Sequence, residues 1–179
     1  MNVLLNDASV LLNLLATGCL EDIVTATGLR IAICPAVRDE VKRLRDPESG
    51  EMVVVDLSPL MTSGLLQLVD LSGEEEQALY VQQAALMDDG EAMSVAIAAS
   101  RRLELALDDK RAAKKAREQF PALRLWTTPE ILKLWADNSA APASQIINAI
   151  RLIEVRARYF PPKGHPLAAW WQALRKGDC

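Results

Sequence analysis

The chain has 179 residues, half of them hydrophobic and a quarter charged, with a formal net charge of −4. This composition predicts a globular protein with one main domain and a substantial core. The cysteines Cys19, Cys34 and Cys179 are far apart without CxxC spacing, which excludes a disulfide framework or a cysteine zinc site and favours a reducing cytoplasm. Asn6 and Asp7 interrupt the apolar N-terminus and no basic residue precedes them, so we expect neither a signal peptide nor a membrane partner.

The two halves of the chain differ in charge. Residues 1–90 hold 5 Lys and Arg against 15 Asp and Glu, a net charge of −10, whereas residues 91–179 hold 15 against 9, a net charge of +6. Such asymmetry can indicate a nucleic-acid partner, because phosphates need a basic surface. Solvated helix faces explain the same pattern equally well.

Short apolar runs alternate with helical stretches along the chain. The runs that we expect to be strands span residues 3–5, 30–34, 52–55, 65–69, 103–107 and 123–126. The expected helices begin near residues 8, 36, 72, 91, 110, 127 and 144, and a short one closes the chain. This alternation predicts an α/β fold with a mostly parallel sheet, whose strands form a ligand crevice at their carboxyl ends.

The first acid at such a junction is Asp7. It separates the run 3–5 from a helix whose apolar residues, from Val10 to Leu15, recur at helical spacing. An N-cap that accepts an amide hydrogen bond is the favoured explanation of Asp7 taken alone. The same position also lies beside the predicted crevice, and the two roles are compatible.

The second acid is Glu40, in a helix predicted over residues 36–44. At about 100° per residue, Val37, Val41 and Leu44 define the buried face. Asp39 then points away from that face, while Glu40 lies only about 65° from its centre. Glu40 is therefore the acid that can reach an interior cleft, although a solvated charge at the rim is an equally good explanation.

The remaining acids flank the helix and strand between residues 87 and 116. Glu91 precedes an apolar helix, where an idle carboxylate is costly to bury, and Asp88 with Glu91 also fits a relaxed capping box. Asp108 and Asp109 follow the strand 103–107, directly before the basic segment KRAAKKAR. One helix cap needs only one of these two acids.

Other polar and aromatic residues have structural explanations. Ser72 and Glu75 fit a capping box, and the glutamates 74–76 are expected to form a solvated first turn. Thr127 is expected to cap the helix that follows it. His165, among prolines and glycine, is expected in a turn, and Trp170 and Trp171 as packing anchors.

The junction acids suggest a metal site. Carboxylates gathered in one cleft repel one another and raise each other's pKa, and Mg²⁺ or Mn²⁺, which prefers oxygen ligands, removes that cost. With a phosphodiester bound, such ions activate water and stabilise the leaving oxygen. This chemistry requires the scattered acids to converge in space.

Four segments together resemble the acidic motifs of PIN-domain proteins, especially the VapC-type toxin ribonucleases. They are LLNDASVLL, ICPAVRDEV, DDGEAMSVAIA and LALDDKRAAKKA. The resemblance covers residues 1 to about 135 and implies a three-layer α/β/α sandwich, Mg²⁺- or Mn²⁺-dependent RNA cleavage, frequent homodimers and often a cognate antitoxin. We therefore expect a PIN-like nuclease domain over residues 1–137, and a C-terminal helical extension over residues 138–179 packed on it.

The resemblance also implies site residues. Asp7, Glu40, Glu91 and Asp109 match the four acids expected to be catalytic. Metal is expected at Asp7, Glu91 and Asp109, with Asp108 auxiliary and Glu40 binding directly or through water. Some of the basic residues after the cleft are expected to contact RNA phosphates: Lys110, Arg111, Lys114 and Lys115.

Other functions remain open at the level of the sequence. A PIN-like binding or regulatory module without catalysis would use the same acids as caps and ion-pair partners. A receiver domain requires an acidic pair after the first strand, and a haloacid-dehalogenase-type phosphatase requires Asp-x-Asp. The chain has only Asp7 there, with Ser9 two residues on.

Overall fold

The computed structural model describes residues 3–177, so Cys179 lies outside the described residues. Within this range, five parallel strands form the central sheet in the order β5-β2-β1-β6-β7. The strands are β1 (Val3–Asn6), β2 (Arg30–Ile33), β5 (Leu66–Leu68), β6 (Glu104–Ala106) and β7 (Leu125–Trp126). The predicted parallel sheet is confirmed.

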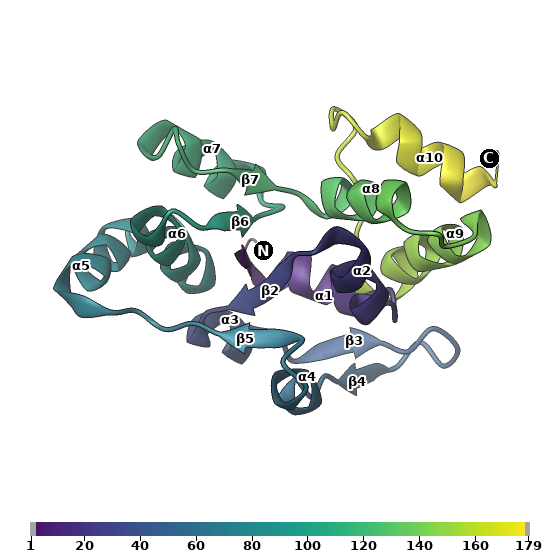
Figure 1. The fold of residues 1–179 in the computed structure, drawn as a ribbon, viewed down its shortest axis with the longest axis horizontal. Coiled ribbons are helices and arrows are strands. Elements are labelled where there is room, and N and C mark those ends of the chain that lie inside the picture. The colour runs from purple at the N-terminus through teal and green to yellow at the C-terminus, as the bar shows by residue number, and fades with distance from the viewer. Residues whose placement is uncertain (1–2, 178–179) are drawn as a thin grey trace.

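Helices cover both faces of this sheet. They are α1 (Ala8–Ala16), α2 (Leu20–Thr27), α3 (Pro35–Glu40), α4 (Ser58–Thr62), α5 (Gly73–Ala84), α6 (Asp89–Arg101), α7 (Lys110–Gln119), α8 (Thr128–Asn138), α9 (Ala143–Leu152), the π-helix η1 (Ile153–Ala157) and α10 (Ala168–Lys176). Helices α5, α6 and α7 lie on one side of the sheet, and α1, α2, α8 and α9 lie on the other (Figure 1). The predicted three-layer α/β/α sandwich is therefore confirmed.

The core lies between these layers. The strand residues Leu4, Leu5 and Leu105 are fully buried, and α6 buries almost every residue from Ala92 to Ala98, as its all-round apolar sequence predicts. Among the described residues, no single helix is long and apolar enough to cross a membrane. Helices α1 and α2 reach that length and hydropathy only as a pair, with a bend of 106° between them.

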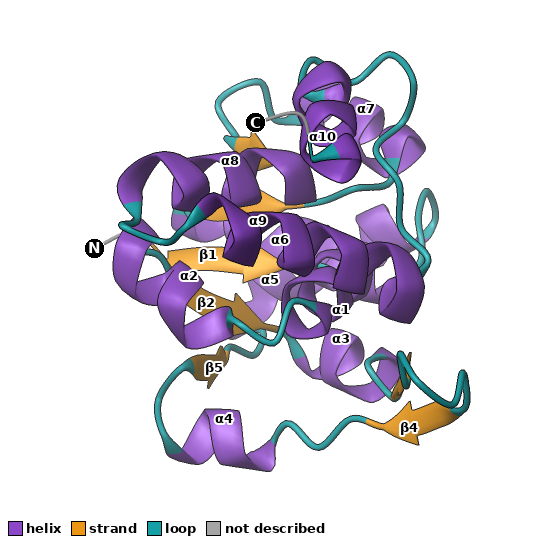
Figure 2. Ribbon diagram, turned by 90° about the vertical axis from the view of Figure 1, so that its right-hand side faces the viewer, coloured by secondary structure: helices purple, strands orange, loops and turns teal. Residues whose placement is uncertain are grey.

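The segment after Pro35 differs from the prediction. Helix α3 ends at Glu40, because Val41 leaves the helical region with ψ 85°, and the helix predicted to reach Leu44 is wrong in its last turn. The chain continues instead into β3 (Arg43–Arg45), which pairs antiparallel with β4 (Met52–Val54) in a separate two-stranded sheet (Figure 1). Strand β4 lies apart from the strands of the central sheet (Figure 2). Val41 and Leu44 are buried in the structure, as they would be in a helix. Their apolar spacing therefore does not distinguish a helix from this turn into a strand.

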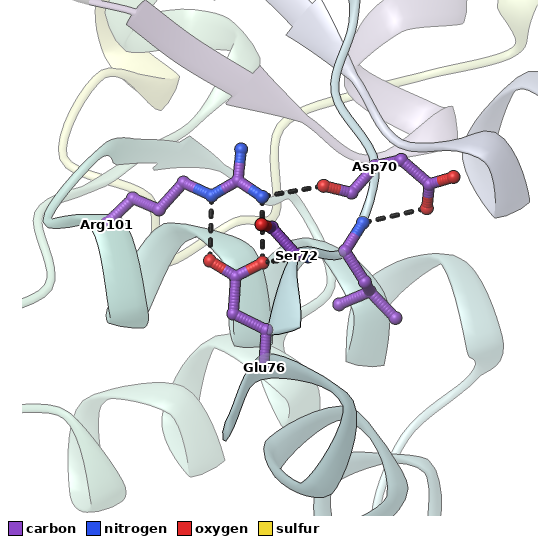
Figure 3. A network of polar contacts seen from close by, with 5 residues as sticks. Asp70, Ser72, Glu76 and Arg101 are labelled. Atoms are coloured by element: carbon purple, nitrogen blue, oxygen red, sulfur yellow. Dashed lines mark hydrogen bonds and ion pairs between the residues drawn. The ribbon is translucent and has the colours of Figure 1, made fainter. Parts of the chain in front are cut away.

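The first turn of α5 is also different from the prediction. The amide of Ser72 donates to Oε2 of Glu76 at 2.6 Å, rather than Glu75 closing the box, and Glu76 is buried. Arg101, at the end of α6, donates from Nε and Nη2 to the two Glu76 oxygens at 2.7 and 2.8 Å, and also to the Asp70 carbonyl (Figure 3). This ion pair joins the two helices, so Glu76 is not a solvated charge.

At the start of α8, the predicted cap is confirmed, because Thr127 and Glu130 form a capping box. The C-terminal helices then pack on the sandwich. Trp171 is buried and donates from its indole nitrogen to Glu154 at 2.9 Å, as expected for a packing anchor. Arg156 in η1 donates to the Ala16 carbonyl at 3.0 Å.

Candidate active site

A cavity of about 420 Å³ opens where the carboxyl ends of β1 and β6 meet the end of α3 and the start of α6. Six acids line it: Asp7, Glu40, Asp88, Glu91, Asp108 and Asp109. Ser9 and Tyr159 complete its polar wall. The cavity thus contains every acid that the sequence analysis singled out, together with Asp88, which had been considered only as a cap.

The adjacency of two strands explains why distant acids meet. Strands β1 and β6 are parallel neighbours, with Asn6 opposite Ala106, and the amide of Asp7 donates to the Ala106 carbonyl at 3.0 Å. Asp7 and the pair Asp108–Asp109 therefore leave the sheet at the same edge. Each junction also starts a helix, where Oδ1 of Asp7 and Oδ1 of Asp109 each accept a backbone amide at 2.7 Å.

Asp7 is the most deeply buried of these acids, with 4% of its surface exposed. Burial raises the pKa of Asp7 to about 7, and the charges of Asp108 and Glu91 raise it further. The Val10 amide and the Ser9 hydroxyl, at 3.1 Å, oppose this shift. Asp7 is therefore both a helix cap and a carboxylate whose charge the surrounding chain compensates poorly.

Glu91 lies in the first turn of α6, where it is partly buried. Burial raises its pKa to about 6, with the charge of Asp109 as the next contribution. The backbone amide of Asp88 lowers the pKa of Glu91, in keeping with the local cap geometry. The charge of Glu91 thus contributes to the raised pKa of Asp7 although 84 positions separate them.

Glu40 is the last residue of α3, and Oε1 accepts the Gly90 amide at 3.1 Å. Burial is the main cause of its raised pKa. A Cβ at Gly90 would lie 2.7 Å from Oε1 and 2.9 Å from Oε2, so only glycine lets the carboxylate rest there. Its neighbour Asp39 instead pairs with Arg38 at the surface.

Asp108 differs from the other acids in its number of protein partners. It accepts hydrogen bonds from the Thr128 amide at 2.9 Å, the Thr128 hydroxyl at 2.6 Å, Asn13 at 3.1 Å and Tyr159 at 3.2 Å. Burial still raises its pKa. These partners come from α1, α8 and the segment after η1, so local sequence gave no signal of them.

Comparison with known families decides the classification. A family model for a PIN domain matches residues 3–156. This chain belongs to the PIN-domain family. PIN domains are generally nucleases that act on nucleic acid, typically with divalent metal ions. No curated protein and no solved structure matches the chain.

The matched part of this PIN domain extends through α9 and most of η1, past residue 137. The division between a nuclease domain and an extension at that residue stays a prediction. The extension nevertheless contributes to the cavity, since Tyr159 lines it.

The donors of this PIN domain fit a hard cation in chemistry, because all are carboxylate oxygens. Among residues 3–177, no Lys or Arg lines the acidic cavity. Burial is the main cause of the raised pKa of Asp7 and of Glu91, and neighbouring acids add to it. As the described side chains stand, no three His, Cys, Asp or Glu residues are arranged to hold a metal ion. The PIN domain thus has oxygen donors suited to a hard cation, but within residues 3–177 no three of them lie close enough together to coordinate one ion.

The predicted RNA-contacting residues of the PIN domain do not form one cluster. Lys110 and Arg111 line separate cavities beside the acids. Lys114 is exposed and pairs with Glu118, while Lys115 donates to the Leu86 carbonyl.

Proposed function

We propose that this PIN domain is a Mg²⁺- or Mn²⁺-dependent endoribonuclease that hydrolyses RNA phosphodiester bonds. The observation that supports it most strongly is the single cavity lined by acids from four regions of the chain, with no lining cation among the described residues. A protein that needed these carboxylates only for stability would gain by pairing them. Their arrangement suits a cation supplied from solution.

In this proposal, Asp7, Glu91 and Asp109 hold the metal, and Glu40 acts directly or through water. Asp108, held by Thr128, Asn13 and Tyr159, supports the cluster as an auxiliary acid. A bound divalent ion supplies activation of a water molecule and stabilisation of the leaving oxygen. The helix caps fix Asp7 and Asp109 in place, so Glu40 and Glu91 are the acids expected to adjust on binding.

The test is cleavage of labelled single-stranded RNA by purified protein with Mg²⁺, Mn²⁺ or EDTA. We expect metal-dependent cleavage that Asp7→Asn lowers by more than about a hundredfold, beyond the typical cost of losing a ligand's supporting partner. Asn keeps an acceptor for the Val10 amide, which preserves the cap. Asp39→Asn is the matched control, because Asp39 lies beside Glu40 but pairs with Arg38 in solvent. Equal activity of wild type and Asp7→Asn would remove the proposed role.

A second candidate is a PIN-like binding or regulatory module without catalysis. The absence of a three-donor arrangement within residues 3–177 favours it. Calorimetry distinguishes the two, since the module would show no specific Mn²⁺ binding.

The resemblance to VapC-type ribonucleases supports a narrower proposal, a cytoplasmic toxin neutralised by an antitoxin protein, with a homodimer as its assembly. A small open reading frame directly beside the gene would be the expected antitoxin. Expression of the toxin alone should arrest growth, and coexpression of the neighbour should relieve the arrest. A solitary gene, or no arrest by the active chain, would favour an RNA-processing role.

A further inference from the structure

A second cavity, of about 280 Å³, adjoins the acidic one. Its lining comes from three parts of the chain: residues 107–117, the start of α8 with its cap Thr127, and the segment 159–166. The side chains that matter here are Asp108, Lys110, Arg117, Glu130, Tyr159 and His165. We propose that this cavity, the tail subsite, binds backbone phosphates of the RNA strand that crosses the acidic cavity, with Lys110 and Arg117 as the phosphate-binding residues. The proposal rests on the proposed nuclease function and adds a strand path to it.

The two cavities share a wall. Asp108 and Tyr159 line both, and the Tyr159 hydroxyl donates to the Asp108 carboxylate at 3.2 Å. A ligand that passes over this hydrogen-bonded pair moves from six acids to a pocket with two cations. The tail subsite is therefore continuous with the candidate active site.

Helix α7 presents both cations to the tail subsite. Lys110, Ala113 and Arg117 all line it, and their spacing places them on one face of a helix. Both cations are exposed, and in the described part of the chain neither is in an ion pair. Lys114 does not line the tail subsite and is already paired with Glu118. Lys110 and Arg117 are thus available to an external anion.

The opposite wall of the tail subsite is fixed by hydrogen bonds. His165 Nδ1 accepts the Leu167 amide at 3.1 Å, so Nε2 carries the hydrogen and donates to the Thr127 hydroxyl at 3.0 Å. The Glu130 carboxylate accepts from the Thr127 amide and hydroxyl, both at 2.8 Å. Glu130 is thereby engaged in capping α8, which leaves Lys110 and Arg117 to set the charge offered to a ligand.

A third cavity adjoins the acidic one along a different part of its lining. It has a volume of about 350 Å³, includes Arg111 and shares Asp88, Glu91 and Asp109 with the acidic cavity. Cations therefore line the two outer cavities, while the described residues place none in the central one. A polyanionic strand that enters all three cavities would meet positive charge in each outer cavity, next to the acids that surround the reacting phosphate. Phosphate contacts of this kind position a strand without specifying its sequence.

The test compares two double variants that remove equal charge. Lys110→Gln/Arg117→Gln removes the proposed phosphate contacts, and Arg151→Gln/Lys176→Gln removes two exposed cations outside the three cavities. Both are made in the chain with Asp7→Asn, so that RNA stays intact. Binding of labelled single-stranded RNA in Mg²⁺ is followed by fluorescence anisotropy over a range of salt concentrations. Cleavage by the same variants with Asp7 present is measured in parallel.

We expect the first variant to bind all RNA sequences more weakly and to reduce the slope of log affinity against log salt by about 1.4, the value for two phosphate contacts on a single strand. In cleavage, its KM should rise with little change in kcat. The control should retain the wild-type slope and KM. Lengthening the RNA at one end should tighten its binding to the chain that carries Asp7→Asn alone. It should not tighten binding to the chain that also carries Lys110→Gln/Arg117→Gln.

The outcomes separate the two proposals. If RNA is cleaved and bound but both double variants behave alike, the tail subsite is overturned and the nuclease proposal stands. If the wild-type chain neither binds nor cleaves RNA, the proposed function fails and the subsite fails with it.

Discussion

Asp7 and Glu76 are both buried carboxylates, with 4% and 6% of their surfaces exposed, but their surroundings treat the negative charge differently. Glu76 accepts a bidentate pair of hydrogen bonds from Arg101, at 2.7 and 2.8 Å, which lowers the pKa of Glu76 below its ordinary value (Figure 3). Asp7 accepts only an amide and a hydroxyl, and burial raises its pKa to about 7.

The difference lies in the partner and not in the depth of burial. An acid that joins two helices gains a cation from its own chain, since an unpaired buried charge is costly. Around Asp7 the neighbouring charges are instead other acids, Asp108 and Glu91. Such a group is stabilised by protons or by an external cation, and the two compete for the same oxygens.

The largest expected effect is on stability against pH without metal. The folded pKa of Asp7 lies above the ordinary 3.8, so its contribution to stability is fully present below pH 4 and is lost as the pH rises through about 7. Wild type should lose about 4 kcal/mol of unfolding free energy relative to Asp7→Asn across this window. Urea denaturation in EDTA at several pH values measures it. If the difference in unfolding free energy between wild type and Asp7→Asn is the same at every pH, ionisation of Asp7 costs the folded protein little stability.

Divalent ions should reverse that loss at neutral pH. At a Mn²⁺ concentration of about 100 times the dissociation constant, binding to the folded state adds about 2.7 kcal/mol, or roughly 5–10 °C in Tm. The gain should grow as the pH rises through the pKa of Asp7 and level off above it, because protons then no longer compete for the carboxylate. Differential scanning fluorimetry with Mn²⁺, and with Asp7→Asn and Asp39→Asn, tests this. Equal shifts for both variants would place the ion elsewhere.

Breaking the ion pair between Glu76 and Arg101 should lower the free energy of unfolding and leave metal binding intact. Arg101→Met leaves Glu76 with the Ser72 amide, and we expect a loss of about 2 kcal/mol, below the usual value for a buried pair because Arg101 is 32% exposed. Adding Glu76→Leu should restore part of this loss. The Mn²⁺-induced rise in Tm should match that of wild type. A reduced rise would mean that the two acidic regions are coupled.

The sequence predicts those parts of this molecule that depend on neighbours along the chain. Short apolar runs and helix starts located all five strands of the central sheet and the acids at their ends. Parallel pairing then brings Asp7 beside Asp108 and Asp109, because strand ends share an edge. The capping box at Thr127 is likewise a local pattern.

Contacts between distant residues explain what the sequence missed at Glu76 and Tyr159, whereas an ambiguous local pattern explains the error after Pro35. Glu76 is buried only because Arg101, 25 positions away, reaches it. The helix after Pro35 stops at Glu40 although Val41 and Leu44 keep helical spacing, since that spacing does not distinguish a helix from a turn into β3. Tyr159, on Asp108, could not be placed from sequence because that contact, too, is between distant residues.

The smallest expected effect concerns the Gly90 contact with Glu40. A Cβ at position 90 would lie 2.7 and 2.9 Å from the two Glu40 oxygens, so Gly90→Ala should move the carboxylate away from the α6 amide. Alanine is otherwise the better helix former by up to about 1 kcal/mol, and stability should therefore change little. Mn²⁺ affinity, measured by calorimetry, should fall about fivefold, or about 1 kcal/mol.

A double-mutant cycle identifies the cause of such a loss. If Gly90 acts by placing Glu40, then Gly90→Ala should have no further effect on Mn²⁺ affinity once Glu40→Ala is present, because contacting residues are not additive. Additive losses would mean that Gly90 acts on Glu91 or on the helix start instead. An unchanged affinity in both single variants would remove Glu40 from the metal-binding set and leave Asp7, Glu91 and Asp109 to hold the ion.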